Sequence, residues 1–161
     1  MDMYVMQVKH DLEMSVLKEI KKLGCNALCP VREQQIRRGG KWHSIQSPLF
    51  PQYVFVECEL NDKIYYDLKK IYGMQRLLGA GKPQKLPESE AAYIRVLNNN
   101  GAPIEASKVY VTSYGEKMIL SGMLRHYTHD IISLDLRQRR AKVEVEIFGI
   151  KHTIILPVIG I

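Results

Sequence analysis

Clusters of basic side chains are the groups in this sequence best suited to ligand chemistry. The 161 residues include 23 Lys and Arg against 17 Asp and Glu, which gives a formal net charge of +6. The clusters are Lys9, His10, Lys18, Lys21 and Lys22; Arg37, Arg38 and Lys41; and Arg137, Arg139, Arg140 and Lys142. Arginine forks and flexible basic loops suit phosphate contacts, so the pattern favours a polyanionic partner. A solvated basic surface is the alternative for each cluster.

Motifs that would support an enzyme are absent. Residues 79–83, GAGKP, have the look of a phosphate-binding loop, but Arg76 stands where the first glycine is needed. Pro83 replaces the required hydroxyl residue and removes a backbone donor. No nucleophile elbow or dinucleotide fingerprint occurs elsewhere, so we expect no enzymatic activity and no cofactor.

The cysteines indicate buried thiols rather than a metal site. Cys25, Cys29 and Cys58 are odd in number and lie within apolar runs, which fits reduced thiols better than a disulfide framework. The Cys25 and Cys29 pair has no second pair at zinc spacing, and His126 and His129 belong to a different part of the chain. We therefore expect no bound metal.

An aromatic-rich segment at residues 48–57, PLFPQYVFVE, is suited to docking a macromolecule. Its two prolines stiffen the chain, and the apolar alternation that follows predicts a strand at an edge or corner of a sheet. Phe50, Tyr53 and Phe55 are thereby expected close together. Plain core packing is the alternative role for these rings.

Apolar periodicity predicts strands alternating with helices in the first part of the chain. The expected strands are Met3–Val8, residues 25–36 paired with 42–46 through a basic glycine turn, Tyr53–Glu59 and Met74–Leu78. The expected helices follow Asp11, then Asn61 or Asp62, and then Pro87. Asp11 should cap the first helix, while Gly24 and Gly73 should end the first two.

The later part of the chain has a different pattern. Residues 98–107 begin with Asn98-Asn99-Asn100-Gly101 and are rich in turn formers, which predicts a linker. Short β-branched segments follow at 115–120, 131–136, 142–148 and 152–156. A segment of about fifty residues buries a core only if its sheet closes, so we expect a small β-barrel.

Several segments resemble the NusG family of transcription elongation factors. Met3–Val8, residues 48–57 and residues 73–83 are similar to its N-terminal (NGN) domain. Residues 115–122, 134–135, 139–145 and 147–149 are similar to its KOW module, in the family's order. The resemblance implies an α+β chain with two domains. The first, at 1–97, would be an α/β sandwich with a mixed, mainly antiparallel sheet flanked by three helices. A linker at 98–107 would join it to a KOW β-barrel at 108–161.

The resemblance also implies a polymerase partner. In that family the N-terminal domain bridges the cleft of RNA polymerase, docks on its clamp helices and restrains pausing. The residues expected to contact the clamp helices are Leu49, Phe50, Tyr53 and Phe55. Those expected to contact the gate loop on the opposite side are Ile64, Tyr65 and Tyr66. Steric bridging needs no catalysis, because apolar burial alone shifts the polymerase between states.

Two departures from general members imply a specialised paralog. Gln52 stands where general NusG proteins carry glycine in a P-G-Y turn. In the KOW loop, Met123 replaces the usual proline and residues 128–130, THD, stand where a glycine normally sits. Within the family the resemblance is closest to LoaP, a paralog of long biosynthetic operons, which implies an antiterminator recruited by an RNA hairpin in the leader transcript.

The resemblance gives the basic residues a role in RNA binding. The operon-specific relative RfaH reads nucleic acid with a face that here carries Lys9, His10, Lys22, Tyr72, Gln75 and Arg76. The remaining expected RNA-binding residues are Arg37, Arg38, Lys41, Arg125, His126, Arg137, Arg139, Arg140 and Lys142. Because the A-form major groove is too narrow for side chains to read, we expect both domains to clamp one hairpin at an irregular loop or bulge.

Other functions remain open at this point. A general housekeeping NusG would reach a ribosomal protein or a termination factor through the KOW module. A ribosomal RNA-binding protein built on a KOW barrel would leave the aromatic segment without a role, and an RNA-modifying enzyme would need catalytic groups that the sequence lacks. No apolar run is long enough for a membrane helix and no signal peptide precedes the first strand, so we expect a cytoplasmic monomer without membrane contact.

Overall fold

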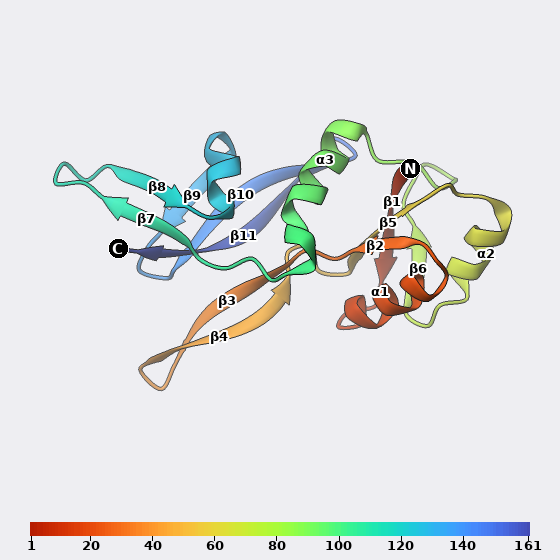
Figure 1. Ribbon diagram of the computed structural model, residues 1–161, viewed down its shortest axis with the longest axis horizontal. Helices are drawn as coiled ribbons and strands as arrows, with labels where there is room; N and C mark the ends of the chain where they lie inside the picture. The colour runs from red at the N-terminus through yellow and green to blue at the C-terminus, as the bar shows by residue number, and fades with distance from the viewer. The chain divides into compact units, whose positions relative to one another are not determined.

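A computed structural model describes residues 1–161, and its elements are traced in Figure 1. The strands are β1 (Asp2–Val8), β2 (Asn26–Leu28), β3 (Val31–Arg38), β4 (Lys41–Pro48), β5 (Tyr53–Cys58), β6 (Met74–Leu77), β7 (Ser107–Val111), β8 (Lys117–Ser121), β9 (Ile131–Asp135), β10 (Arg140–Ile147) and β11 (Ile150–Gly160). The α-helices are α1 (Glu13–Lys22), α2 (Asp62–Lys69) and α3 (Glu88–Leu97), and the 3-10 helices are η1 (Asn99–Gly101) and η2 (Met123–Asp130). None of the helices has the length and apolar character of a membrane-spanning helix.

The chain divides into two compact units. Unit 1 comprises Met1–Cys29 and Phe50–Gly101, and unit 2 comprises Pro30–Leu49 and Ala102–Ile161. The second boundary falls inside the expected linker at 98–107. Residues 30–49, which the sequence places with the first 97 residues, group instead with the C-terminal part of the chain.

Unit 1 is built on a four-stranded sheet in the order β2-β5-β1-β6. All its pairings are antiparallel, so the sheet is fully antiparallel rather than mixed as expected. Alternate residues of the two central strands, such as Met6 and Val54, are fully buried in one cluster with Val16 and Ile20 of α1 and Leu68 of α2. The period of two in the strands meets the helical period on that face, which produces the core.

The ends of α1 and α2 follow local backbone chemistry. Asn61 caps α2, since its side-chain oxygen accepts a hydrogen bond from the Ile64 N–H at 2.9 Å. Gly24 follows the end of α1 at φ 87°, as expected for a C′ glycine. Asp11 is not the N-cap of α1; Leu12 is. Asp11 lies one residue before the N-cap with a left-handed φ of 67°, and its N–H donates to the Glu13 carboxylate.

The expected role of Gly73 as the end of α2 is also wrong. The helix stops at Lys69 with Lys70 as its C-cap. Gly73 has φ 98°, and a Cβ at this position would lie 2.9 Å from a methyl group of Leu12. This glycine therefore allows the chain leaving α2 to approach the start of α1 closely.

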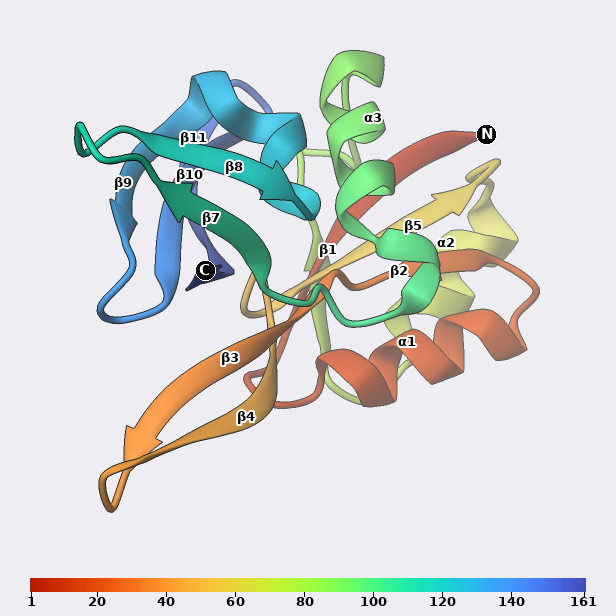
Figure 2. The same cartoon turned by 60° about the vertical axis from the view of Figure 1, so that its left-hand side comes forward.

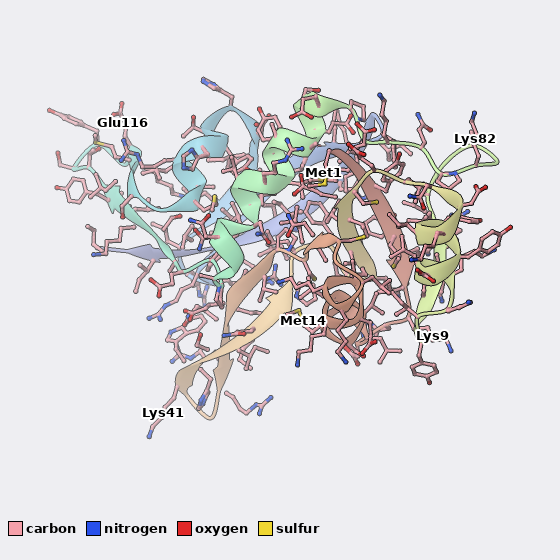
Figure 3. All side chains as sticks on the ribbon, turned by 45° about the vertical axis from the view of Figure 1, so that its right-hand side comes forward. Met1, Lys9, Met14, Lys41, Lys82 and Glu116 are labelled. Atoms are coloured by element: carbon pink, nitrogen blue, oxygen red, sulfur yellow. The ribbon has the colours of Figure 1, made fainter.

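Unit 2 contains a long hairpin, β3–β4, in register from Val31 opposite Pro48 to Arg38 opposite Lys41. Gly39 and Gly40 turn the chain at φ 60° and 75°, which confirms the expected glycine turn. Figure 3 shows Lys41 at the tip of this hairpin.

The base of the hairpin is tied to the C-terminal segment of unit 2. The Glu33 N–H donates to the Ile104 carbonyl, and the Ile104 N–H donates to the Val31 carbonyl, at 2.9 and 2.8 Å. Arg32 adds a side-chain bond from Nη1 to the carbonyl of Ile155 in β11, at 2.9 Å. In Figure 2 the hairpin extends away from the β7–β11 sheet of the same unit.

The rest of unit 2 is a five-stranded sheet in the order β8-β7-β11-β10-β9. The β7–β11 pair is parallel and the others are antiparallel. The two edge strands are linked by the Lys117 ammonium, which donates to the Leu134 carbonyl at 2.9 Å, so the sheet is barrel-like as expected. Strand β7 and helix η2 were not expected from the sequence.

Gly122 sits at the tightest backbone approach in this sheet. It has φ 98°, and a Cβ there would clash with the Ser107 hydroxyl, which is fully buried and accepts a hydrogen bond from the Leu124 N–H.

We expect Gly122→Ala to lower the free energy of unfolding by about 2 kcal/mol more than Gly115→Ala does. Gly115 is the matched control, because it has φ 83° with nothing near its missing Cβ. Urea denaturation of both variants measures the difference, and equal losses would contradict the steric explanation.

Candidate functional site

The aromatic segment holds its rings together but mostly inside the protein. Phe50 and Phe55 make an edge-to-face contact with centroids 5.4 Å apart, so the expected proximity is present. Phe55 is 0% exposed, and Phe50 and Leu49 are 4% exposed. These three side chains are therefore not exposed for docking. For Phe55 the reason is that β5 is an inner strand of its sheet rather than an edge, whereas Leu49 and Phe50 precede β5. Tyr53 is the member of the set that is partly accessible.

Gln52 occupies a turn position that suits glycine. The Tyr53 N–H donates to the Phe50 carbonyl at 3.1 Å, which closes a four-residue turn with Pro51 and Gln52 in its centre. Gln52 has φ 69°, as the third residue of a type II turn requires. A non-glycine residue pays about 1 kcal/mol for this conformation.

The start of α2 presents an aromatic surface in unit 1. Tyr65 and Tyr66 make an edge-to-face contact at 5.5 Å, and Tyr66 is 60% exposed. The Lys69 ammonium lies 5.2 Å from the centre of the Tyr65 ring. Ile64 is half-buried and packs on the core, so it supports this surface more than it forms it.

A basic and aromatic group lies between β1 and β6 of unit 1. The Lys9 ammonium is 5.2 Å from the ring centre of Tyr72, which is 74% exposed. Arg76 donates from Nε to the Gln7 side chain at 2.9 Å, and Gln75 beside it is exposed. Of the residues expected on this face, the structure thus brings Lys9 and Tyr72 into contact. Figure 3 shows Lys9 at the periphery of its unit.

Two expected members of that face have acidic neighbours. Lys22 pairs with Glu19 one turn earlier in α1, at 3.0 Å. His10 lies 3.4 Å from a carboxylate oxygen of Asp11, which is an ion pair only when the imidazole is protonated. Both pairs are exposed, so they contribute little to stability.

The second basic group belongs to unit 2 and is centred on an aromatic residue that sequence reasoning missed. Arg139, in the turn before β10, places its guanidinium carbon 4.3 Å from the ring centre of Trp42 in β4. Arg37 lies opposite Trp42 in the hairpin register, at 5.8 Å from the same ring. A lone tryptophan facing an arginine across a hairpin was the signal that could have revealed it.

The other barrel residues divide into two sets. Arg137, Arg140 and Lys142 line one open recess of about 620 Å³ together with Lys117 and Asp135. Arg125 and His126 lie on η2 and do not line it; the ring of His126 is 6.5 Å from that of Tyr127.

The hairpin and turn arginines lack acidic partners. The ion pairs of the structure are His10–Asp11, Lys22–Glu19, Arg95–Glu57, Arg95–Glu88 and Lys151–Glu144. None involves a basic residue of the β3–β4 hairpin or of the β9–β10 turn. A set of uncompensated guanidinium groups gives this region a positive potential that attracts anions.

The cysteines are free and buried, as expected. Burial, with a smaller effect from the Glu13 charge, raises the pKa of Cys29 to about 12. Burial, followed by the neighbouring Cys25, raises the pKa of Cys58 to about 11. No group of three or more His, Cys, Asp or Glu side chains is arranged to hold a metal ion.

Comparisons with known proteins point to one family. Residues 1–95 match the family profile described as "Transcription termination factor nusG". The chain is 26% identical to the transcription termination/antitermination protein NusG of Helicobacter pylori (strain J99) over 92% of this chain and 90% of that protein. It is 31% identical to the protein of the same name from Rickettsia felis, over 76% of this chain and 64% of that protein.

A solved structure supports the fold. The structure described as "Domain interaction in Thermotoga maritima NusG" superposes with a TM-score of 0.60 at 24% identity. The match covers 98% of this chain and 93% of that one. At this identity the likeness concerns the fold alone.

The raised pKa values predict slow alkylation of the thiols. At about pH 8, a shift from 9.0 to about 11 lowers the thiolate fraction of Cys58 about 100-fold, and Cys29 falls further. We expect iodoacetamide to modify both cysteines at least about 100-fold more slowly in the native protein than in urea, followed by mass spectrometry. Rapid native modification of either one would contradict this burial.

Proposed function

This chain belongs to the NusG family of transcription termination and antitermination factors, which are not enzymes, and we propose that it is a specialised member of that family. It would bind elongating RNA polymerase and suppress pausing and termination on selected operons. An RNA hairpin in the nascent leader transcript would recruit it. Residues 1–97 would carry the polymerase contact and the KOW segment at 108–161 part of the RNA contact.

The observation that carries this proposal is the uncompensated basic surface of unit 2. Arg37 and Arg139 converge on Trp42, and neither makes an ion pair with a carboxylate. Nucleic-acid affinity depends chiefly on such groups, because each phosphate they neutralise releases counterions. The Lys9, Tyr72 and Arg76 group of unit 1 supports a second contact of the same chemistry.

The polymerase contact would use the β5 turn and α2. Tyr53 is partly accessible at the start of β5, while Phe50 and Phe55 are buried and would hold the turn that presents it. The exposed Tyr66 and its neighbour Tyr65 would form the gate-loop contact. Aromatic residues at a rigid surface are typical anchors of protein interfaces.

The Gln52 turn supports a specialised rather than a general role. General members carry glycine at this position, and the structure has the left-handed backbone that glycine adopts without strain. A glutamine kept at about 1 kcal/mol of strain is consistent with a side chain used by a partner.

A general NusG elongation factor is the second candidate. It is favoured by the names of the relatives, which are transcription termination/antitermination proteins in Helicobacter, Rickettsia and Thermus. In that case the KOW segment would contact a ribosomal protein or a termination factor instead of RNA.

Transcription in vitro through a terminator separates the two candidates. We expect the protein to increase read-through only when the template encodes the leader hairpin upstream. Tyr53→Ala should reduce read-through several-fold, because an interface anchor is worth roughly 1–2 kcal/mol. Tyr114→Ala is the matched control, since Tyr114 is 93% exposed in the β7–β8 turn of unit 2 and is not one of the residues proposed to contact the polymerase.

Read-through of equal size with and without the hairpin would favour the general factor. If the Tyr53→Ala protein were as active as the wild type, the proposed β5 contact would be wrong. The same read-through measurement on Tyr66→Ala would then test the α2 contact.

A further inference from the structure

Trp42 is the only tryptophan of the chain and lies half-buried on β4 beside two guanidinium groups. The Arg139 guanidinium carbon is 4.3 Å from the ring centre, which is stacking distance. Arg139 has φ 58° in the β9–β10 turn, so a strained residue carries this side chain to the hairpin. An arginine face stacked on an indole offers a flat platform on which a further flat, polarisable ring can stack.

Arg139 also lines a small cleft, next to two other arginines. Arg32, Arg139 and Arg140 line it together with Glu33, Gln34, Gln35, Ile155 and Pro157. The Arg32 Nη1 is held by the Ile155 carbonyl, but its Nε is buried without a hydrogen-bond partner. Burial lowers the pKa of Arg32, and the charge of Arg140 lowers it further.

The positive charge of this cleft is not neutralised from within the protein. Glu33 lines the cleft but makes no ion pair with Arg32, Arg139 or Arg140, and the only side-chain partner of Arg140 is the Gln138 amide. Holding three guanidinium groups together is unfavourable unless an anion joins them. A phosphate has the charge and the oxygen geometry that arginine forks bind.

We propose that Trp42 and Arg139 form a binding site for one unpaired nucleotide of a nucleic-acid strand. The base stacks on the Trp42–Arg139 pair, Arg140 binds the adjacent phosphate, and the fixed charge of Arg32 beneath the cleft favours that phosphate. A fully paired duplex cannot supply this ligand, because its bases are stacked on each other. A bulged or looped nucleotide of the leader hairpin can, and in that respect the inference rests on the proposed function.

The unique tryptophan makes the site directly observable. Trp42 emission is followed while the full-length protein is titrated with single-stranded RNA of about ten nucleotides, DNA of the same sequence, or a blunt RNA duplex. We expect saturable quenching by the single strands and little by the duplex at equal phosphate concentration. The ratio of the RNA and DNA affinities assigns the strand, and quenching by either one supports the site.

Variants separate stacking from charge. By anisotropy of the labelled RNA strand, Trp42→Ala and Arg139→Ala should each weaken binding about tenfold. Arg139→Lys keeps the charge but loses the planar face, so it should also weaken binding several-fold. Trp42→Phe should retain most affinity. Lys151→Ala is the control, because it removes one exposed charge from β11 of the same unit. Circular dichroism verifies that each variant is folded.

Two results would overturn the site: RNA that binds by anisotropy without changing Trp42 emission, or an Arg139→Lys protein that binds as tightly as the wild type. The results that would contradict the proposed function are different from those that would contradict this site. Trp42 quenching together with read-through that ignores the hairpin would keep this site and remove hairpin recruitment. Hairpin-dependent read-through with unchanged Trp42 emission would do the reverse.

Discussion

The hydrogen bonds between the base of the β3–β4 hairpin and Ile104 are the constraint on which the rest of unit 2 depends. They pair Val31 and Glu33 with a residue about seventy positions later in the chain, and the Arg32 bond to Ile155 adds a second tie. Without them the hairpin would be an isolated two-stranded ribbon, which is marginally stable in water. With them, Trp42 on β4 meets Arg139 from a turn of the barrel-like sheet.

Charge and packing oppose each other in this unit. The Lys117 bond to Leu134 and the buried Ser107 bond to Leu124 satisfy polar groups within the sheet, as folding requires. The arginines of the hairpin and the β9–β10 turn are left without carboxylates, which costs stability through mutual repulsion. Such an arrangement lowers the free energy of unfolding but favours the binding of anions. The packing and hydrogen bonds of the sheet must offset the lost stability.

The sequence predicted features that depend on a few neighbouring residues. Asn61, Gly24 and the Gly39–Gly40 turn were identified correctly because caps and tight turns are decided by local backbone geometry. The prediction that Asp11 caps α1 was wrong because this residue has a left-handed backbone, with its N–H bonded to the Glu13 carboxylate. β7 was missed although its residues 108–111, KVYV, alternate as a strand does, because it directly follows the turn-rich stretch taken as a linker. The Trp42–Arg139 contact joins positions far apart in sequence, and no periodicity encodes it.

The position of the hairpin in the chain has a consequence for synthesis. Residues 30–49 emerge from the ribosome between the two segments that build unit 1, yet their partners, Ile104 and Ile155, are made much later. Domains generally fold as their residues become available, so unit 1 can close around its own sheet while the hairpin still lacks its anchors. The arginine–tryptophan cluster is therefore among the last parts of the molecule to assemble, after the sheet and helices of unit 1.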